Sequence, residues 1–333
     1  MSVAAERRRG RRWLTPLMAE RLALPVAWGI LCIVFSIVRP DTFPTVDNFA
    51  TIFGSQAVLV VLTLALLVPL TAGDYDLTIA ANATLSAMVV AILNADHGWA
   101  IGWAILAALG IGAFVGFVNG GLVVLLGADS LIVTLGTSTF IAGVVLWISD
   151  SQTITGVSEG LTTWVVDKRL FSIPLEFYYA LGIGVVMFYV FEFTPLGRRL
   201  LFVGRGRSVA RLSGLRVGRL RWGAMVASGV ISAFAGVLYA GTIGAADPTS
   251  ALAFLLPAFA AAFLGATSIQ PGRFNPFGAI VAVYFLVTGI TGLQLLGAQS
   301  YVQNLFYGGA LVLAVALSQL ARRREAIDFA AGE

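Results

Sequence analysis

The sequence predicts an all-α polytopic membrane protein with about ten transmembrane helices. Of its 333 residues, 58% are hydrophobic and only 11% are charged, whereas an average soluble domain carries roughly 25% charged residues. The apolar residues form continuous runs without the period-two alternation of a membrane β-barrel. Helices must dominate, because lipid cannot hydrogen-bond an unpaired backbone. This composition excludes an ordinary soluble enzyme, and abundant apolar residues with a net charge of only +4 exclude a disordered chain.

The predicted spans are apolar segments of about 20 residues, the helix length that crosses a bilayer core. The first ends at Arg39-Pro40, and the third begins beside Asp76, a carboxylate placed to cap a helix and meet its positive end. The least regular segments are the third, which contains several Ser, Thr and Asn residues, and the eighth, which contains Pro257. In order, the ten segments are 22–38, 51–72, 77–94, 99–126, 131–148, 175–193, 222–243, 252–270, 275–296 and 300–320.

Small residues mark one face of the fourth predicted span. Gly112, Gly116 and Gly120 recur there at four-residue spacing. Glycines on one face of a helix let a second helix approach closely, because no side chain separates the two backbones. We therefore expect this face of 99–126 to pack against another transmembrane helix.

The basic residues predict the orientation of the spans. An arginine-rich segment at 7–12 precedes the first span, and no small-residue cleavage site follows, so we expect an uncleaved span and not a signal peptide. With ten spans and a cytoplasmic N-terminus, 18 of the 21 Lys and Arg residues lie inside, as the positive-inside rule requires. An odd number of spans would place the arginine clusters on opposite sides.

These assignments predict a multi-pass protein of the cell (inner) membrane with both termini in the cytoplasm. The predicted organisation is a basic cytoplasmic N-terminal segment at 1–21, a transmembrane domain at 22–320 and a cytoplasmic tail at 321–333. Within the domain, residues 149–174 form an external loop. Residues 194–221 form the only long cytoplasmic loop, with eight arginines and no acidic residue.

Several kinds of chemistry are excluded because the residues they need are missing. One cysteine, Cys32, and one histidine, His97, cannot build a His/Cys metal site. The only lysine, Lys168, does not stand in the Gly-Lys-Ser/Thr step of a phosphate-binding loop, so the chain does not hydrolyse nucleotides by itself. No charged residue lies in the interior of a predicted span, since Glu192 is at a cytoplasmic end. This argues against an ion-driven carrier and a membrane-embedded enzyme, and we expect no catalytic residue, metal, cofactor or nucleic-acid partner.

Uncharged polar residues inside the spans have two interpretations. They can form hydrogen bonds between helices, or they can line a pathway for a neutral, hydroxyl-rich solute if several converge. The sequence alone does not distinguish the two. The candidates for a pathway are Gln56, Asn82, Asn119, Thr134 and Gln294; other polar residues of this kind are Thr137, Ser138, Gln299, Gln303 and Asn304.

The long cytoplasmic loop predicts a docking element. Pro195 and Gly197 end the sixth span, residues 207–213 contain no helix breaker, and Gly214 is a natural residue to stop a helix. Contact with lipid headgroups is the alternative for so basic a segment. Headgroup contact alone does not require a defined helix and stop, so the pattern favours a binding site for a cytoplasmic partner.

At this loop the sequence resembles the membrane permease subunit of ribose-type sugar ABC importers. The family pattern there reads T-x-L-G-R, a glycine-rich step and A-x-R-L-S-G-I, which residues 194–198 and 210–215 match closely. Three further stretches agree in order with the family patterns D-L-S-V, L-G-G-T-S-L and N-G-L-N-L-L-G, namely 76–79, 264–269 and 291–297. The chain departs from the family pattern at Ala80, Arg205, Leu255 and Pro257, which leaves the identity of the solute and the local helix shape open.

The resemblance implies a core of two permeases, identical or different, each with ten spans. It further implies an external solute-binding protein and two cytoplasmic ABC ATPase domains docked on 205–217, with a monosaccharide or similar neutral solute as substrate. The predicted coupling residues are Arg207, Arg211, Leu212, Ser213, Gly214, Leu215 and Arg216. Of these, we expect the three arginines to form an exposed charged rim around the contact made by the other four. Two alternatives remain: a permease of the related amino-acid or nucleoside importers, and, less favoured, an ion-coupled secondary transporter.

Overall fold

The computed structural model describes residues 16–331, which are almost entirely helical. The arginine-rich segment 7–12 and the last two residues of the predicted tail lie outside the described residues. In chain order the elements are α1 (Pro16–Val38), α2 (Val46–Ser55), α3 (Ala57–Thr71), α4 (Ile79–Ala91), η1 (Ile92–Asp96), α5 (Ile101–Leu125), α6 (Ser130–Ile148), β1 (Ile154–Thr155), α7 (Glu159–Thr162), η2 (Thr163–Asp167), β2 (Arg169–Leu170), β3 (Ile173–Pro174), α8 (Leu175–Phe193), α9 (Pro195–Arg205), α10 (Arg207–Leu212), α11 (Val217–Ile243), β4 (Ala245–Ala246), η3 (Ser250–Phe254), α12 (Leu255–Gly265), α13 (Pro276–Leu295) and α14 (Tyr301–Ala331).

Eight of these helical segments are long and apolar enough to cross a membrane, and each coincides with one predicted span. The predicted spans 252–270 and 300–320 correspond to shorter apolar helices, Ala251–Gly265 and Tyr301–Ala316. The polytopic helical class is therefore confirmed, while the number of ten spans stays a prediction. Helix α14 continues beyond residue 320, the predicted end of its span, as far as Ala331.

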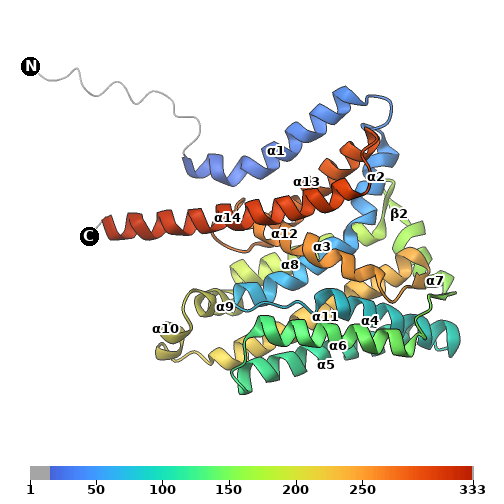
Figure 1. The fold of residues 1–333 in the computed structure, drawn as a ribbon, viewed down its shortest axis with the longest axis horizontal. Helices are drawn as coiled ribbons and strands as arrows, with labels where there is room; N and C mark the ends of the chain where they lie inside the picture. The colour runs from blue at the N-terminus through green and yellow to red at the C-terminus, as the bar shows by residue number, and fades with distance from the viewer. Residues whose placement is uncertain (1–15, 332–333) are drawn as a thin grey trace, which may run out of the picture.

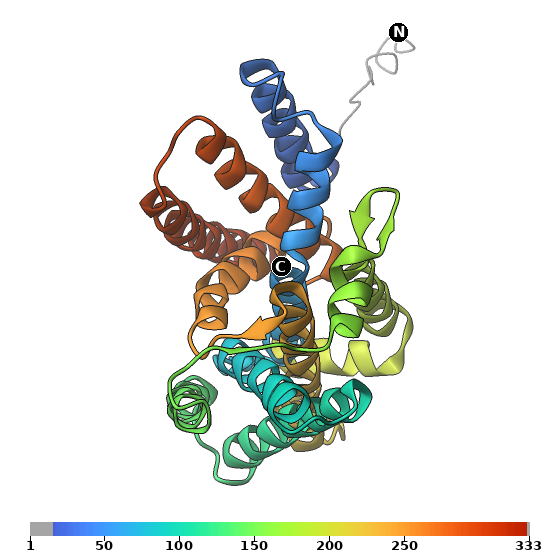
Figure 2. The same cartoon turned by 90° about the vertical axis from the view of Figure 1, so that its right-hand side faces the viewer.

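The centre of the bundle is α3, whose fifteen residues are all buried. A helix that is apolar on every side either lies inside a protein or spans a membrane, and the burial of all its residues places α3 inside the bundle. Helices α11, α12, α8 and α13 pack around α3, and α11 also packs along α4 and α5. In Figure 1, α1 lies at one edge of the bundle and α5 and α6 at the other; Figure 2 shows several helices nearly end-on.

The outer helices expose large apolar side chains. Ile37 of α1 is 74% exposed and Phe140 of α6 is 72% exposed, and both have many exposed apolar neighbours. On a protein in water, so much exposed apolar surface would cause association or aggregation. In a membrane the same side chains contact lipid tails, which agrees with the polytopic class.

The glycine face of the fourth predicted span packs as expected. A Cβ atom at Gly116 would collide with the backbone of α11 at Met225, and one at Gly112 would collide with Ala233. The indole of Trp222 takes up the space beside Gly120 and donates a hydrogen bond of 2.9 Å to the carbonyl oxygen of Phe117. This close approach of α5 and α11 holds together the part of the bundle that carries the cytoplasmic loop.

Two short antiparallel strand pairs organise the predicted external loop. β1 pairs with β4, so the segment after α6 is joined to the segment after α11. β2 pairs with β3 in a hairpin just before α8. The backbone amide of Ser158 also donates to the side-chain oxygen of Asn94, at 2.7 Å, which holds the loop against the end of η1.

Candidate functional site

The predicted cytoplasmic loop, residues 194–221, contains two helices, α9 and α10. Thr194 caps α9, since its hydroxyl accepts a hydrogen bond from the backbone amide of Gly197, and Pro195 occupies the first turn, where no amide hydrogen is required. Gly204 of α9 lies so close to the carbonyl of Thr71 that a Cβ atom there would collide with it. The loop is therefore seated directly on the end of the central helix α3.

Helix α10 ends as its sequence predicts, at Gly214. This glycine has φ +81°, a left-handed conformation that side chains with a Cβ rarely adopt. The amide of Gly214 donates to the carbonyl of Arg211 at 3.0 Å, and the amide of Leu215 donates to that of Ala210 at 3.1 Å. These two bonds form a Schellman motif, which satisfies the last carbonyls of the helix and turns the chain toward α11.

One side of α10 is anchored and the other is exposed. Ala210 is buried with Val203 and Val217 in a small apolar cluster, against which Leu215 packs. On the opposite side Leu212 is 89% exposed. The predicted coupling residues therefore fall into two groups. Leu215 helps to hold the helix in place. The exposed end of the helix consists of Leu212, Ser213 and Gly214, with Arg211 and Arg216 beside it.

Arg207, predicted as an exposed rim charge, contacts the body of the protein instead. Its Nη2 donates to a carboxylate oxygen of Asp74 at 2.8 Å and to the carbonyl of Gly73 at 2.6 Å. The same carboxylate accepts bonds of 2.7 Å from Nε and Nη2 of Arg221. This cluster of Asp74, Arg207 and Arg221 joins α10, α11 and the turn before α4. The sequence did not single out Asp74, which stands two residues before the predicted cap Asp76.

Asp76 is buried and connects three helices. It accepts hydrogen bonds from the backbone amide of Thr78 at 2.9 Å and from the hydroxyl of Ser228 at 2.7 Å. Burial raises the pKa of Asp76 above its ordinary value, and the hydrogen bonds from Thr78 and Ser228 oppose that shift. The amide of Asn119 donates to the Thr78 hydroxyl at 3.2 Å. The predicted capping role of Asp76 is therefore wrong: Thr78 is the N-cap of α4, and no side chain among the described residues caps the helix. Asp76 instead links the turn before α4 with α11 and, through Thr78, with α5.

Three of the five pathway candidates serve helix packing. Asn82 donates from α4 to the Gly229 carbonyl and the Ser232 hydroxyl of α11, each at 2.8 Å. Asn119 makes the bond to Thr78 described above, and Thr134 donates to the carbonyl of Ser130, one turn earlier in α6, at 2.7 Å. All three side chains are buried. Asn82 and Asn119 thus bond neighbouring elements of the bundle, whereas Thr134 bonds within α6.

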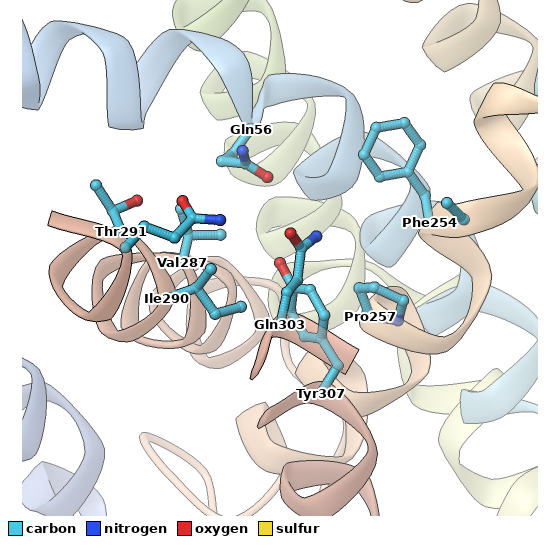
Figure 3. A pocket seen from close by; sticks show the side chains of 10 residues that line it. Gln56, Phe254, Pro257, Val287, Ile290, Thr291, Gln303 and Tyr307 are labelled. Carbon is cyan, nitrogen blue, oxygen red and sulfur yellow. The ribbon is translucent and has the colours of Figure 1, made fainter. Parts of the chain in front are cut away.

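The other two candidates, Gln56 and Gln294, line one pocket of about 140 Å³. Figure 3 shows this pocket between four segments, with Gln56, Thr291 and Gln303 among its walls. Of the other polar lining residues, Gln303 is one of the further polar residues of the predicted spans, Thr291 belongs to the stretch 291–297, and Tyr307 was not singled out from the sequence. Their spacing along α13 and α14 carries no signal that they meet Gln56.

The positions that depart from the family pattern have ordinary structural surroundings. Ala80 is buried in the first turn of α4, and Arg205 is the last residue of α9. Leu255 begins α12, so Pro257 falls in its first turn, where proline is tolerated. Pro257 also lines the pocket of Gln56 and Gln294.

One buried carboxylate was not singled out from the sequence. Glu176 lies in the first turn of α8 and is 2% exposed, and its Oε2 accepts a hydrogen bond of 2.6 Å from the Thr242 hydroxyl of α11. Within residues 16–331, no group of three or more His, Cys, Asp or Glu side chains could hold a metal ion.

Comparison with known proteins identifies relatives along most of the chain. Residues 48–315 match the family described as branched-chain amino acid transport system / permease component. The D-allose transport system permease protein of Escherichia coli K12 is 28% identical over 292 residues, which is 88% of this chain and 89% of that protein. The L-arabinose ABC transporter permease protein of Azospirillum brasilense is 28% identical over 338 residues, 97% of this chain and 94% of the relative.

A third relative, the ribose import permease protein of Escherichia coli K12, is 26% identical over 309 residues, 92% of this chain and 96% of its own length. No solved structure matches the chain. The family match covers the cytoplasmic loop, the pocket and all the helices from α3 to α13. The chain therefore belongs to the branched-chain amino acid transport system / permease component family.

Proposed function

We propose that this chain is the permease subunit of an ABC importer and forms the translocation pathway for a monosaccharide or a similar small neutral solute. An external binding protein delivers the solute, and separate cytoplasmic subunits hydrolyse ATP. The relatives named above are permeases for D-allose, L-arabinose and ribose, which supports a sugar. The uncharged lining of the pocket at Gln56 and Gln294 also favours a neutral solute over an amino acid.

The observation that carries the proposal is the form of α10. It is a short helix with a defined glycine stop, an anchored inner side and an exposed leucine, in a chain without a phosphate-binding loop. Docking that transmits force requires an apolar contact held rigidly from behind. We therefore assign Leu212, Ser213 and Gly214 to the contact with the ATPase and Arg211 and Arg216 to its rim.

The proposed topology has ten spans with both termini in the cytoplasm of a cell (inner) membrane. The distribution of basic residues supports it, since 18 of 21 then lie inside. In this arrangement α12 and the first part of α14 are the two short spans, and a second permease, identical or different, completes the pathway. Residues 149–174 lie outside, where the binding protein docks.

Uptake by cells that produce the chain with its ATPase and binding protein tests the proposal. We expect accumulation of labelled D-allose, D-ribose, L-arabinose or D-galactose, and loss of uptake when the ATPase subunit is omitted. Uptake of L-leucine and of none of these sugars would instead assign the chain to the amino-acid branch. Sugar accumulation by the chain alone, driven by a proton or sodium gradient, would refute an ATP-driven importer.

Replacing Gly214 with valine tests the coupling role of α10. No atom lies within 4 Å of a Cβ at this position, so the variant suffers backbone strain and no collision. A β-branched residue at φ +81° costs about 1–3 kcal/mol and disturbs the helix stop. We expect the variant to insert normally but to lose stimulated ATP hydrolysis and uptake, while Gly214→Asn, which tolerates the left-handed conformation, keeps most of both. Wild-type stimulation in Gly214→Val would rule out this loop as the coupling element.

A further inference from the structure

We propose that the pocket lined by Gln56, Gln294 and Gln303 is a site where the transported sugar makes direct hydrogen bonds with this chain. The inference rests on the proposed function and adds to it the location of the contact and the groups that make it. The three side-chain amides hydrogen-bond the hydroxyls of a neutral monosaccharide, and the apolar walls beside them pack on its carbon-bound hydrogens.

The pocket is built from four segments that are distant in sequence. Gln56 stands at the break between α2 and α3, Phe254 and Pro257 come from η3 and α12, and α13 and α14 supply the remaining walls. Figure 3 shows Gln56 on one side of the space and Gln303 facing it from α14. Breaks in transmembrane helices place polar groups at substrate sites in transporters, because the residues at a break are not held within a continuous helix and can face the solute.

The amides of the pocket are free to bind a solute. Among the residues that the structure describes, the side chains of Gln294 and Gln303 have no hydrogen-bond partner, and Gln56 donates only to the neighbouring Ser55 hydroxyl, at 3.1 Å. Each glutamine offers two donors and an acceptor that a sugar hydroxyl can complement. By contrast, Asn82 and Asn119 donate to other elements of the bundle, and Thr134 donates within α6. Three glutamine amides that no other described helix holds therefore line one pocket.

The remaining walls also suit a sugar. The pocket volume of about 140 Å³ is many times the roughly 10–15 Å³ that one water molecule occupies by the same measure, so a small solute has room. Phe254, Pro257 and Ile290 supply apolar walls beside the amides, with Phe254 and Pro257 on one side of Gln303 and Ile290 on the other (Figure 3). No residue lining the pocket is charged, so a zwitterionic amino acid would lose hydration without gaining a partner for its charges.

Protection of a cysteine from chemical modification tests whether sugar occupies the pocket. Thr291 lines the pocket, and Thr291→Cys in a Cys32→Ser background adds a single thiol of similar size to the original side chain. The probe is whichever of D-allose, D-ribose, L-arabinose and D-galactose the complete importer takes up. We expect a saturating amount of that sugar to slow the labelling of Thr291→Cys, and not that of the matched control Gln299→Cys, which is exposed outside the pocket.

Substitution of the amides provides the second measurement. Each of Gln294→Leu and Gln303→Leu should lower the maximal sugar uptake rate about twofold to tenfold, the effect of one lost hydrogen bond. ATP hydrolysis stimulated by the loaded binding protein should persist, which shows that the complex is assembled. Gln303→Asn, which retains an amide, should recover part of the rate, and Gln299→Leu should leave it unchanged.

Each result decides between separate conclusions. Equal labelling of Thr291→Cys with and without sugar, together with unchanged uptake in both leucine variants, would overturn this site while leaving the importer function intact. If the wild-type importer takes up none of the four sugars, the proposed function fails and the site fails with it. An equal loss of uptake in the asparagine and leucine variants of Gln303 would also contradict hydrogen bonding by the amide.

Discussion

Removal of the Asp74 carboxylate should destabilise the end of the bundle that carries α10. Asp74 is the shared acceptor of Arg207 and Arg221, and its side chain is 2% exposed. Asp74→Ala therefore leaves two guanidinium groups facing a space that held their counter-charge. Breaking a buried ion pair by removing one partner costs about 3–5 kcal/mol, because the remaining charge stays desolvated.

The two arginines should differ in their contribution. Arg221 bonds the carboxylate through two nitrogens at 2.7 Å, and its side chain is only 14% exposed. Arg207 bonds it through one nitrogen at 2.8 Å, and its side chain is 44% exposed. Solvent screens the pair of Asp74 with Arg207, which reduces its contribution to the free energy of unfolding to about 0–1 kcal/mol. Arg221→Ala should therefore resemble Asp74→Ala, and Arg207→Ala should be much milder.

Thermal unfolding of the purified chain in lipid nanodiscs, followed by tryptophan fluorescence, measures these differences. We expect the largest decreases in unfolding temperature for Asp74→Ala and Arg221→Ala, and almost none for Arg219→Ala, an exposed arginine of the same helix without an ion pair among the described residues. The double variant Asp74→Ala/Arg221→Ala should lose less than the sum of the two single losses. Equal effects of Arg207→Ala and Arg221→Ala, or a wild-type unfolding temperature for Asp74→Ala, would refute the reasoning.

Two further predictions concern packing and topology. Gly116→Leu should destabilise the protein by about 1–3 kcal/mol or more and reduce its yield in membranes, because the side chain would force α5 away from α11. The control Gly110→Ala has open space around its Cβ and should unfold like wild type. A Gly116→Leu variant as stable as wild type would contradict the close approach of the two helices. In a Cys32→Ser background, an impermeant thiol reagent should label Ser158→Cys in intact cells and Ser208→Cys only after the cells are opened. Labelling of Ser208→Cys from outside would invert or overturn the topology.

Much of the fold could be predicted from the sequence because it depends on local properties. The thickness of a bilayer sets the length of an apolar span, so eight of the predicted segments coincide with candidate membrane helices. The spacing of Gly112, Gly116 and Gly120 places them on one face whatever the partner, and the structure shows that α11 packs there. The end of α10 is equally local, since Gly214 and the two hydrogen bonds beside it lie within six residues of chain.

Other features depended on contacts between distant residues. The break at Gln56 follows Gly54 by two residues, yet the predicted span 51–72 ran through both without interruption, because a single glycine in an apolar run does not by itself end a helix. The rim role predicted for Arg207 rested on its place in a basic loop, whereas its partner, Asp74, lies 133 residues away in sequence. A charge run in the sequence shows that a segment is basic, but not which of its members is neutralised by folding.

The helical membrane class, the resemblance to the permease family, most of the spans, the glycine packing face and the short helix in the 194–221 loop could all be read from the sequence. Which polar side chains meet became visible only in the folded chain. Asn82 and Gln56 look alike as polar residues in apolar runs, yet one bonds α11 and the other lines a pocket. The physical reason is that burial and hydrogen-bond partners arise from packing between helices, which the composition of a single helix does not contain.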